Sequence, residues 1–230
     1  MKAIKRFFGF IFLIIFVTIG LIIWSGYSKY EKALTQTPLA EAVDKIRSID
    51  NYTSVYEVPE MYKNAVIAAE DRRFYLHNGF DIIGTARAVV VCIKTKSLAE
   101  GGSTITQQLA KNMYFLQDNS PTRKLAEIFM ALRIEKEYKK DDILELYMNG
   151  IYYGSGYYNI YDASMGYFGK APSEMNDYEA TLLAGVPNAP SVYSPKVNPD
   201  LSKKRQEKII SCLVECDYIT SDEGDEILGR

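Results

Sequence analysis

The chain has 230 residues, of which 47% are hydrophobic and 24% are charged, and its formal net charge is −2. This length suits one ordinary domain rather than two, and the composition excludes a wholly disordered chain. The nearly balanced charge provides no bulk basic field, so no nucleic-acid partner is expected and any cationic site must be local.

The first segment has the pattern of a membrane anchor. Residues 7–24 carry no charge and form a run long enough to cross a bilayer, at about 1.5 Å per helical residue. Lys2, Lys5 and Arg6 precede the run, so the positive-inside rule places the N-terminus in the cytoplasm and the rest of the chain outside. A cleaved signal peptide is the alternative, but its apolar region is usually shorter and ends in an Ala-x-Ala-like site.

The chain after the anchor divides into two parts. Residues 1–26 are interpreted as the cytoplasmic tip and the transmembrane anchor. Residues 27–55 are mixed and polar, with Thr37 and Pro38 interrupting the pattern, and we interpret them as a stalk. Residues 56–230 are interpreted as one domain, because no later segment is long and apolar enough to span a membrane again.

The domain is expected to be mainly α, with helices around one core. Apolar residues recur at helical spacing in five segments, which begin near Ile82, Ile105, Leu125, Ile143 and Ile160. No alternating strand pattern is strong. Helix boundaries are indicated by Pro121, Pro199, Gly185 and the capping pair of Asn176 and Glu179.

The three cysteines, Cys92, Cys212 and Cys216, are an odd number without the spacing of a metal site. Cys212 and Cys216 lie four residues apart in a helical segment, which suits neither a disulfide nor a zinc site. We interpret all three as small buried hydrophobic residues, so the core must stabilise the fold without disulfides.

Polar residues share one face of the helix predicted in EGGSTITQQLAKN, residues 100–112. They follow the i, i+3, i+4, i+7 spacing and are Thr104, Gln107, Gln108 and Lys111. This face offers hydroxyl, amide and ammonium groups without a carboxylate to neutralise the lysine, so it can hold a sugar hydroxyl or a phosphate. A solvated polar face is the alternative, but such a face would normally mix Glu and Lys.

The next predicted helix carries a second charged cluster. Arg123 and Glu127 are i, i+4 neighbours, and Lys124 lies beside them. A surface ion pair, which contributes only a few tenths of a kcal/mol, is one interpretation. The other is a site that supplies one carboxylate beside a cationic pocket.

One acidic residue directly follows an apolar run. Glu70 comes after Val66 and Ile67, and a carboxylate held against apolar surface can exchange a proton near neutral pH. Plain solvation is the alternative for the pair of Glu70 and Asp71. His77 is the only histidine, and by itself it would more often be structural than catalytic.

Together these segments resemble the peptidoglycan glycosyltransferases of family 51, which form the polymerising domain of class A penicillin-binding proteins and the monofunctional transglycosylases. The first family motif is matched at Glu70, Asp71, Phe74, His77, Gly79 and Asp81. The second is matched at every fixed position of residues 101–112, and the third at Arg123, Lys124 and Glu127. ILELYMNGIYYGSGYYNI and LLAGVPNAPSVYSP resemble the fourth and fifth motifs, and no penicillin-binding Ser-x-x-Lys module follows.

The resemblance implies a lysozyme-like helical glycosyltransferase domain after one N-terminal transmembrane helix. This type of enzyme polymerises lipid II into β-1,4 glycan strands, inverts the anomeric carbon and releases undecaprenyl pyrophosphate. Glu70 is then the general base and Glu127 the second catalytic carboxylate. The residues expected to bind substrate are Asp71, Phe74, Arg87, Thr104, Gln107, Gln108, Lys111, Arg123 and Lys124. Those expected to support the motifs are His77, Gly79, Asp81 and Ser103.

The resemblance also implies partners and a location. The partners are lipid II, the growing glycan strand, the membrane and other cell-wall synthesis and division proteins. The location is the bacterial cell membrane, crossed once, with the catalytic domain outside. No cofactor or metal bound by the protein is expected, but a divalent cation, Mg or Mn, can accompany the pyrophosphate.

Two alternatives remain open at this stage. A lysozyme-like peptidoglycan hydrolase could use Glu70 and Glu127, but cleavage by water does not need the cations Lys111 and Arg123. An inactive membrane-anchored scaffold for cell-wall proteins would not need Glu70 or a complete second motif.

Overall fold

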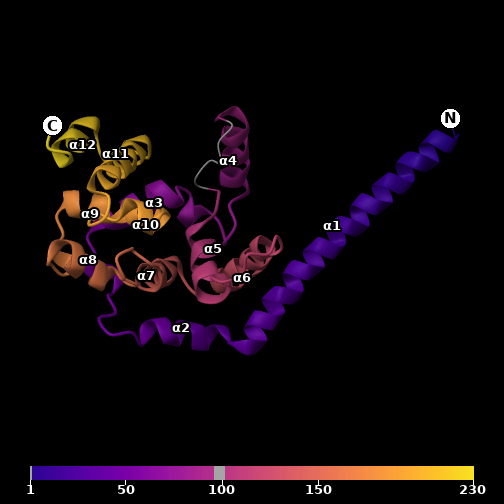
Figure 1. The fold of residues 1–230 in the computed structure, drawn as a ribbon, viewed down its shortest axis with the longest axis horizontal. Helices are drawn as coiled ribbons and strands as arrows, with labels where there is room; N and C mark the ends of the chain where they lie inside the picture. The colour runs from indigo at the N-terminus through magenta and orange to yellow at the C-terminus, as the bar shows by residue number, and fades with distance from the viewer. Residues whose placement is uncertain (1, 96–101) are drawn as a thin grey trace.

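The structure is a computed structural model that describes residues 2–95 and 102–230, without the side chains of residues 2–5, 89 and 91–95. Within these residues the chain is helical and has no strand, which confirms the mainly α prediction (Figure 1). The α-helices are α1 (Lys2–Gln36), α2 (Leu39–Arg47), α3 (Glu60–Glu70), α4 (Ile82–Thr95), α5 (Ile105–Ala110), α6 (Arg123–Glu137), α7 (Lys140–Gly150), α8 (Ile160–Phe168), α9 (Asp177–Gly185), α10 (Pro190–Tyr193), α11 (Pro199–Glu215) and α12 (Ser221–Ile227). The shorter turns are η1 (Val55–Glu57), η2 (Phe74–Leu76), the π-helical η3 (Lys111–Phe115), η4 (Pro172–Glu174) and η5 (Val186–Asn188).

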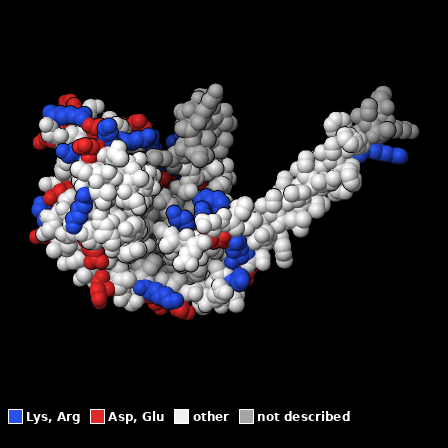
Figure 2. Space-filling model, in the orientation of Figure 1, with Lys and Arg blue, Asp and Glu red and all other residues white. Residues whose placement is uncertain are grey.

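The first helix leaves the body of the molecule as one long rod (Figure 1). Its segment Arg6–Gln36 is long and apolar enough to cross a membrane, and none of its apolar window is buried against the rest of the chain. Figure 2 shows a basic side chain near the outer end of this rod and further basic side chains at its base, with uncharged side chains between them. An apolar surface of this length is unfavourable in water and favourable in lipid.

The base of α1 packs directly on α6. The buried ring of Tyr30 lies 6.1 Å from the ring of Phe129. Gly26 lies so close to α6 that an added Cβ would meet the Cβ of Leu125 at 2.5 Å. The end of the rod nearest the domain is therefore part of the domain's packing.

Residues 27–55 do not form the polar stalk that we expected. The end of α1 and all of α2 are helical, and Leu39, Val43 and Val55 are buried in the same core cluster as the rest of the domain. The reason is that apolar side chains recur at helical spacing between the polar ones, so α2 can pack against α7.

Two short helices form the centre of the domain. α3 packs against α9 and α11, and α5 packs against α6 and α7. Ile105, Leu109 and Ala110 of α5 are fully buried, and each large apolar side chain buried in this way stabilises the fold by about 1.5–3 kcal/mol. Asp71, which directly follows α3, contacts Ile105, the first residue of α5, and this junction positions the candidate site.

Most of the predicted helix boundaries are confirmed. The Asn176 side chain accepts a hydrogen bond from the Glu179 N–H at the start of α9, which ends at Gly185. Pro199 is the first residue of α11. α6 begins at Arg123 rather than at Pro121, because a turn closed by the hydrogen bond from Arg123 N–H to Ser120 O precedes it.

The two described cysteine side chains are free and only half-buried. The Arg72 guanidinium donates to Cys212 Sγ at 3.5 Å, and burial raises the pKa of the Cys216 thiol. The side chain of Cys92 lies outside the described residues, so its predicted burial stays a prediction.

Candidate active site

The carboxylate of Glu70 is held at both of its oxygen atoms. Glu70 is the last residue of α3, and its side chain is 7% exposed. Gln108 of α5 donates from Nε2 to Oε2 at 2.8 Å, and Arg205 of α11 donates from Nη2 to Oε1 at 3.2 Å. Three helices thus fix one buried carboxylate, and they supply the ion pair and hydrogen bond that a buried charge needs.

Arg205 is a site residue that the sequence analysis missed. The buried stripe of α11 consists of Ser202, Arg205, Gln206, Ile209, Ile210 and Leu213. Because a buried arginine requires an anionic partner, the position of Arg205 in this stripe was a signal for a buried carboxylate elsewhere. Arg205 stands in the charged run SKKRQEKI, and such a run is more typical of a solvated helix face.

Tyr147 is a second residue that the sequence analysis missed. It lies on α7 with 1% of its surface exposed, and its hydroxyl donates to Gln108 Oε1 at 3.3 Å. Burial, with a smaller effect from the Glu70 charge, raises the pKa of Tyr147 well above its ordinary value. In the sequence Tyr147 follows Ile143 at helical spacing, so it was interpreted only as a core residue.

Asp71 joins the first motif to the second. Its Oδ2 accepts hydrogen bonds from the Ile105 N–H at 3.1 Å and from His77 Nε2 at 2.9 Å. The Gly79 N–H donates to His77 Nδ1 at 3.1 Å, so Nδ1 is an acceptor and the imidazole proton is on Nε2. His77 therefore connects Asp71 to the loop that follows.

Gly79 and Asp81 shape that loop. Gly79 has φ +90°, and a Cβ at this position would meet the backbone of Ala131 on α6 at 2.8 Å. Both the left-handed conformation and the close approach therefore require glycine. Asp81 accepts from the Ile83 N–H at 3.0 Å, which caps α4, and its Oδ2 lies 3.2 Å from Nε of Arg73.

The start of α5 uses two predicted ligand residues for its own capping. The Gln107 N–H donates to Thr104 Oγ1 at 3.1 Å, and the Thr104 N–H donates to Gln107 Oε1 at 3.0 Å. Thr104 also donates to the carbonyl of Gly79 at 2.8 Å. Both side chains are buried, so the open polar face that we expected is reduced to Gln108 and Lys111.

Lys111 begins the π-helical turn that follows α5. It is half-buried and forms no ion pair with any residue in the described part of the chain. Turns of this kind are often found at functional sites.

Glu127 lies beneath two cations of α6. Its carboxylate is 3% exposed, and the Arg123 Nε and Lys124 Nζ atoms lie 3.0 Å and 2.9 Å from its two oxygens. Lys124 also donates to Ser103 Oγ at 2.7 Å, which links α6 to the start of α5. Two cations against one carboxylate leave a net positive charge, and the cations are the more exposed groups.

Three predicted binding residues do not join this cluster as expected. Phe74 is fully buried in the core, with Lys140 Nζ 4.5 Å from its ring centroid. Asp71 is buried and engaged in the protein contacts described above. Arg87 is exposed on α4, and it contacts none of the other predicted site residues that the structure describes. Gly101 lies outside the described residues.

The acidic side chains of the site do not fit a metal centre. Among the described residues, no group of three or more His, Cys, Asp or Glu side chains could hold a metal ion. Glu70 and Glu127 each pair with a cationic side chain, and Asp71 pairs with His77. A divalent cation held by several carboxylates therefore has no set of ligands in this cluster.

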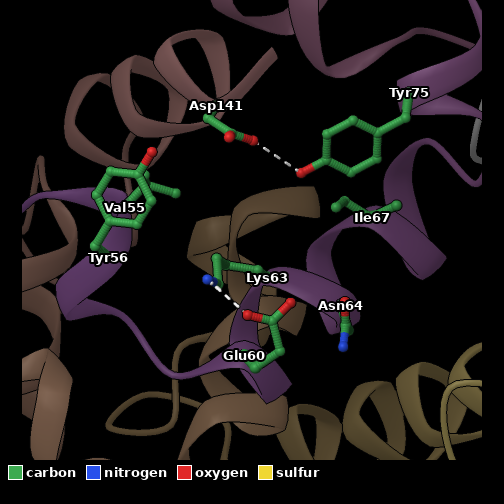
Figure 3. A pocket seen from close by; sticks show the side chains of 8 residues that line it. All are labelled: Val55, Tyr56, Glu60, Lys63, Asn64, Ile67, Tyr75 and Asp141. Carbon is green, nitrogen blue, oxygen red and sulfur yellow. Dashed lines mark hydrogen bonds and ion pairs between the residues drawn. The ribbon is translucent and has the colours of Figure 1, made fainter.

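A separate pocket of about 220 Å³ lies beside the first half of α3 (Figure 3). In its wall the Tyr75 hydroxyl donates to Asp141 at 3.2 Å, and Lys63 pairs with Glu60 at 2.7 Å. None of the predicted site residues lines this pocket, so it is distinct from the cluster around Glu70.

Comparison with known proteins assigns the family. The model of the transglycosylase family matches residues 36–214, a stretch that contains Glu70, Gln108, Glu127 and Arg205. The chain belongs to this family, the peptidoglycan glycosyltransferases of family 51. In this glycosyltransferase the match runs from the last residue of α1 into α11, and the apolar part of α1 lies outside it.

Relatives of this glycosyltransferase are of two kinds. It is 46% identical over 179 residues to penicillin-binding protein 1A of Neisseria lactamica, a match that covers 78% of this chain and 22% of that protein. The match to penicillin-binding protein 1F of Bacillus subtilis is 42% identical over 177 residues and covers 77% of this chain and 25% of that protein. A Cupriavidus necator protein named "Putative transglycosylase" is 42% identical over 193 residues, a match that covers 84% of this chain and 83% of that protein. The chain thus spans about a quarter or less of these penicillin-binding relatives and most of the last protein.

Proposed function

We propose that the chain is a membrane-anchored enzyme that polymerises lipid II into β-1,4 glycan strands and releases undecaprenyl pyrophosphate. The observation that carries this proposal is the buried Glu70 carboxylate, held by Gln108 one helical turn before Lys111, which forms no ion pair with the described residues. A base held by α5 and a cation in the turn that follows α5 suit a reaction in which a hydroxyl loses its proton while a pyrophosphate leaves.

The proposed step is a displacement at the anomeric carbon of the growing strand. The 4-hydroxyl oxygen of an incoming lipid II forms the new bond to this carbon. The bond from the carbon to the pyrophosphate oxygen breaks, and its electron pair leaves with the lipid pyrophosphate. Glu70 accepts the hydroxyl proton as the new bond forms, and attack opposite the leaving group turns the α linkage into a β linkage.

The cationic side chains stabilise the leaving group in this proposal. Lys111 is free of ion pairs with the described residues, and Arg123 and Lys124 present their charged ends above Glu127. Arginine suits phosphate oxygens because its fork donates two parallel hydrogen bonds. Glu127 orients the two cations, and Thr104 and Gln107 hold the start of α5 instead of touching the sugar.

The proposed setting is the bacterial cell membrane, with α1 as a single-pass anchor and the N-terminus in the cytoplasm. The uncharged stretch of the rod supports a single span (Figure 2), and Lys2, Lys5 and Arg6 before it support a cytoplasmic N-terminus. Anchoring confines the enzyme and lipid II to one surface and raises their effective concentration. Other cell-wall synthesis and division proteins are proposed partners. A Mg or Mn ion enters with the pyrophosphate, and no step depends on a protein-held metal.

The test is polymerisation of labelled lipid II by the full chain in detergent, followed by gel separation of the product. We expect a ladder of glycan strands from the wild type and none from Glu70→Gln. The circular dichroism spectrum of Glu70→Gln should match that of the wild type, which would show that the variant is folded. Glu226→Gln, on the exposed surface of α12, is the matched control and should keep full activity. A lack of polymer under several detergent and cation conditions would contradict the proposal.

The same reaction mixtures separate the transferase from a hydrolase. Preformed glycan strands are incubated with the enzyme in the absence of lipid II. Strands that stay intact support the transferase, and strands that are shortened in a Glu70-dependent manner indicate a lysozyme-like hydrolase.

A further inference from the structure

We infer that Tyr147 is a positioning residue for Glu70 and acts through the side-chain amide of Gln108. The observation is a chain of two hydrogen bonds, from the Tyr147 hydroxyl to Gln108 Oε1 at 3.3 Å and from Gln108 Nε2 to Glu70 Oε2 at 2.8 Å. The inference rests on the proposed function, in which Glu70 is the base.

The direction of this chain follows from charge. Glu70 is ion-paired with Arg205, and an ionised carboxylate can only accept hydrogen bonds. Gln108 must therefore turn its NH2 group toward Glu70 and its carbonyl oxygen away from it. That oxygen meets the hydroxyl of Tyr147, which is the donor at this position.

The phenol is suited to a permanent donor role. Tyr147 is a buried residue of α7, and this burial raises the pKa of its hydroxyl well above the ordinary value. It therefore keeps its proton throughout the neutral range, and it holds Gln108 in the same orientation whenever the base is ionised. The terminal torsion of a glutamine side chain is broad, so the amide has no strong preference of its own.

Loss of the hydroxyl frees that torsion. A rotated amide brings its oxygen toward the carboxylate of Glu70, which is repulsive, and leaves Arg205 as the remaining hydrogen-bond donor among the described contacts of Glu70. The position of a general base matters most as the proton moves, so the loss falls on kcat more than on KM.

Tyr147 also packs in the core, so the test must separate positioning from stability. Tyr147→Phe keeps the ring and removes only the hydroxyl. Tyr153→Phe is the matched control, because Tyr153 is equally buried and its hydroxyl bonds to Tyr62 at 2.7 Å and to the carbonyl of Met148 at 3.2 Å. Neither of these contacts reaches Gln108.

The kinetic experiment compares four variants of the full chain, namely Tyr147→Phe, Tyr153→Phe, Gln108→Ala and the Gln108→Ala/Tyr147→Phe double variant. We expect Tyr147→Phe to lower kcat about ten-fold with little change in KM, and Tyr153→Phe to keep kcat within about two-fold. Because Tyr147 acts through Gln108, its substitution should add nothing in the Gln108→Ala background. Unchanged kcat in Tyr147→Phe, equal losses in both phenylalanine variants or additive losses in the double variant would overturn the inference.

A second measurement does not depend on catalysis. In the isotope-labelled wild type, the Gln108 side-chain amide should give sharp NMR signals, and Tyr147→Phe should shift or broaden them. Identical amide signals in the two proteins would overturn the inference. A chain that makes no polymer but shows this difference would refute the proposed function and leave the positioning of Gln108 intact.

Discussion

The Nη2 atom of Arg205 lies 3.2 Å from Oε1 of Glu70, although 135 positions separate the two residues in the chain. Both side chains are buried, so the pair attaches α11 to the end of α3 inside the domain. Loss of one partner leaves the other charge without its ion pair in a site of low dielectric constant, which is more costly than loss of both.

Arg205→Met is therefore expected to lower the free energy of unfolding by about 3 kcal/mol and to abolish polymerisation. The Glu70→Gln/Arg205→Met double variant removes both charges and should regain most of that stability, but no activity. Urea denaturation followed by circular dichroism measures the stability, and the lipid II gel measures the activity. A double variant less stable than Arg205→Met would show that the ion pair does not account for the cost.

Lys111→Ala tests whether the ammonium group of the π-helical turn binds the pyrophosphate. We expect kcat/KM for lipid II to fall about 100-fold, because a cation at the leaving group stabilises the transition state. The rate should also become less sensitive to salt, since one charge pair is lost. Lys136→Ala, an exposed lysine in the last turn of α6, is the control. Equal effects of the two substitutions would contradict the assignment.

Sequence reasoning predicted the local pairs of this site and missed the distant ones. The i, i+4 spacing of Arg123 and Glu127 and the capping pair of Asn176 and Glu179 follow from helix geometry, and both are present. The contact of Glu70 with Arg205 depends on how α3 and α11 pack, and helical periodicity within one segment carries no information on that.

Some residues have two valid interpretations at the same spacing. Thr104 and Gln107 share a helix face, but Thr-x-x-Gln at a helix start is also a capping box, and capping decides their burial. Phe74 follows a charged segment, yet the turn η2 directs its side chain into the core. In residues 27–55, apolar side chains at helical spacing lie between the polar ones, and this pattern predicts a packed helix as well as the polar composition predicts a stalk.

An ion pair in the loop before α6 should make the stability of the fold depend on pH. Lys29 Nζ donates to Asp118 Oδ2 at 2.6 Å, and this hydrogen bond holds the pKa of Asp118 down at about 2. The carboxyl of an unfolded aspartate titrates near 3.9, so the bond stabilises the fold above about pH 3.9. That contribution is lost as the pH falls from there toward about 2.

Lys29→Gln should therefore raise the pKa of Asp118 toward its ordinary value, as measured by NMR titration of the side-chain carboxyl. Lys32→Gln, an exposed lysine of the same helix, should leave it unchanged. A low pKa that persists in Lys29→Gln would assign the effect to the Ser120 N–H, which also donates to this carboxylate at 2.8 Å.

The close contact of Gly26 with α6 leads to a prediction about stability, because it lets α1 pack directly on the helix that carries Glu127. A Cβ at this position would meet the Cβ of Leu125 at 2.5 Å, so Gly26→Val forces α1 and α6 apart. We expect a loss of about 1–3 kcal/mol, since overpacking of a close contact costs this much. At about 2–4 °C per kcal/mol for a chain of this size, the shift is easily measured in a thermal melt.

Gly20→Val is the matched control, because the same side chain enters the same helix at a position with nothing within 4 Å. Its intrinsic cost to the helix equals that of Gly26→Val, so the difference between the two melts isolates the packing of α1 on α6. Polymerisation should fall only in Gly26→Val, because displacement of α6 moves Arg123 and Lys124 away from the start of α5. Equal melting temperatures would mean that α1 is only a tether and that its base does not stabilise the catalytic domain.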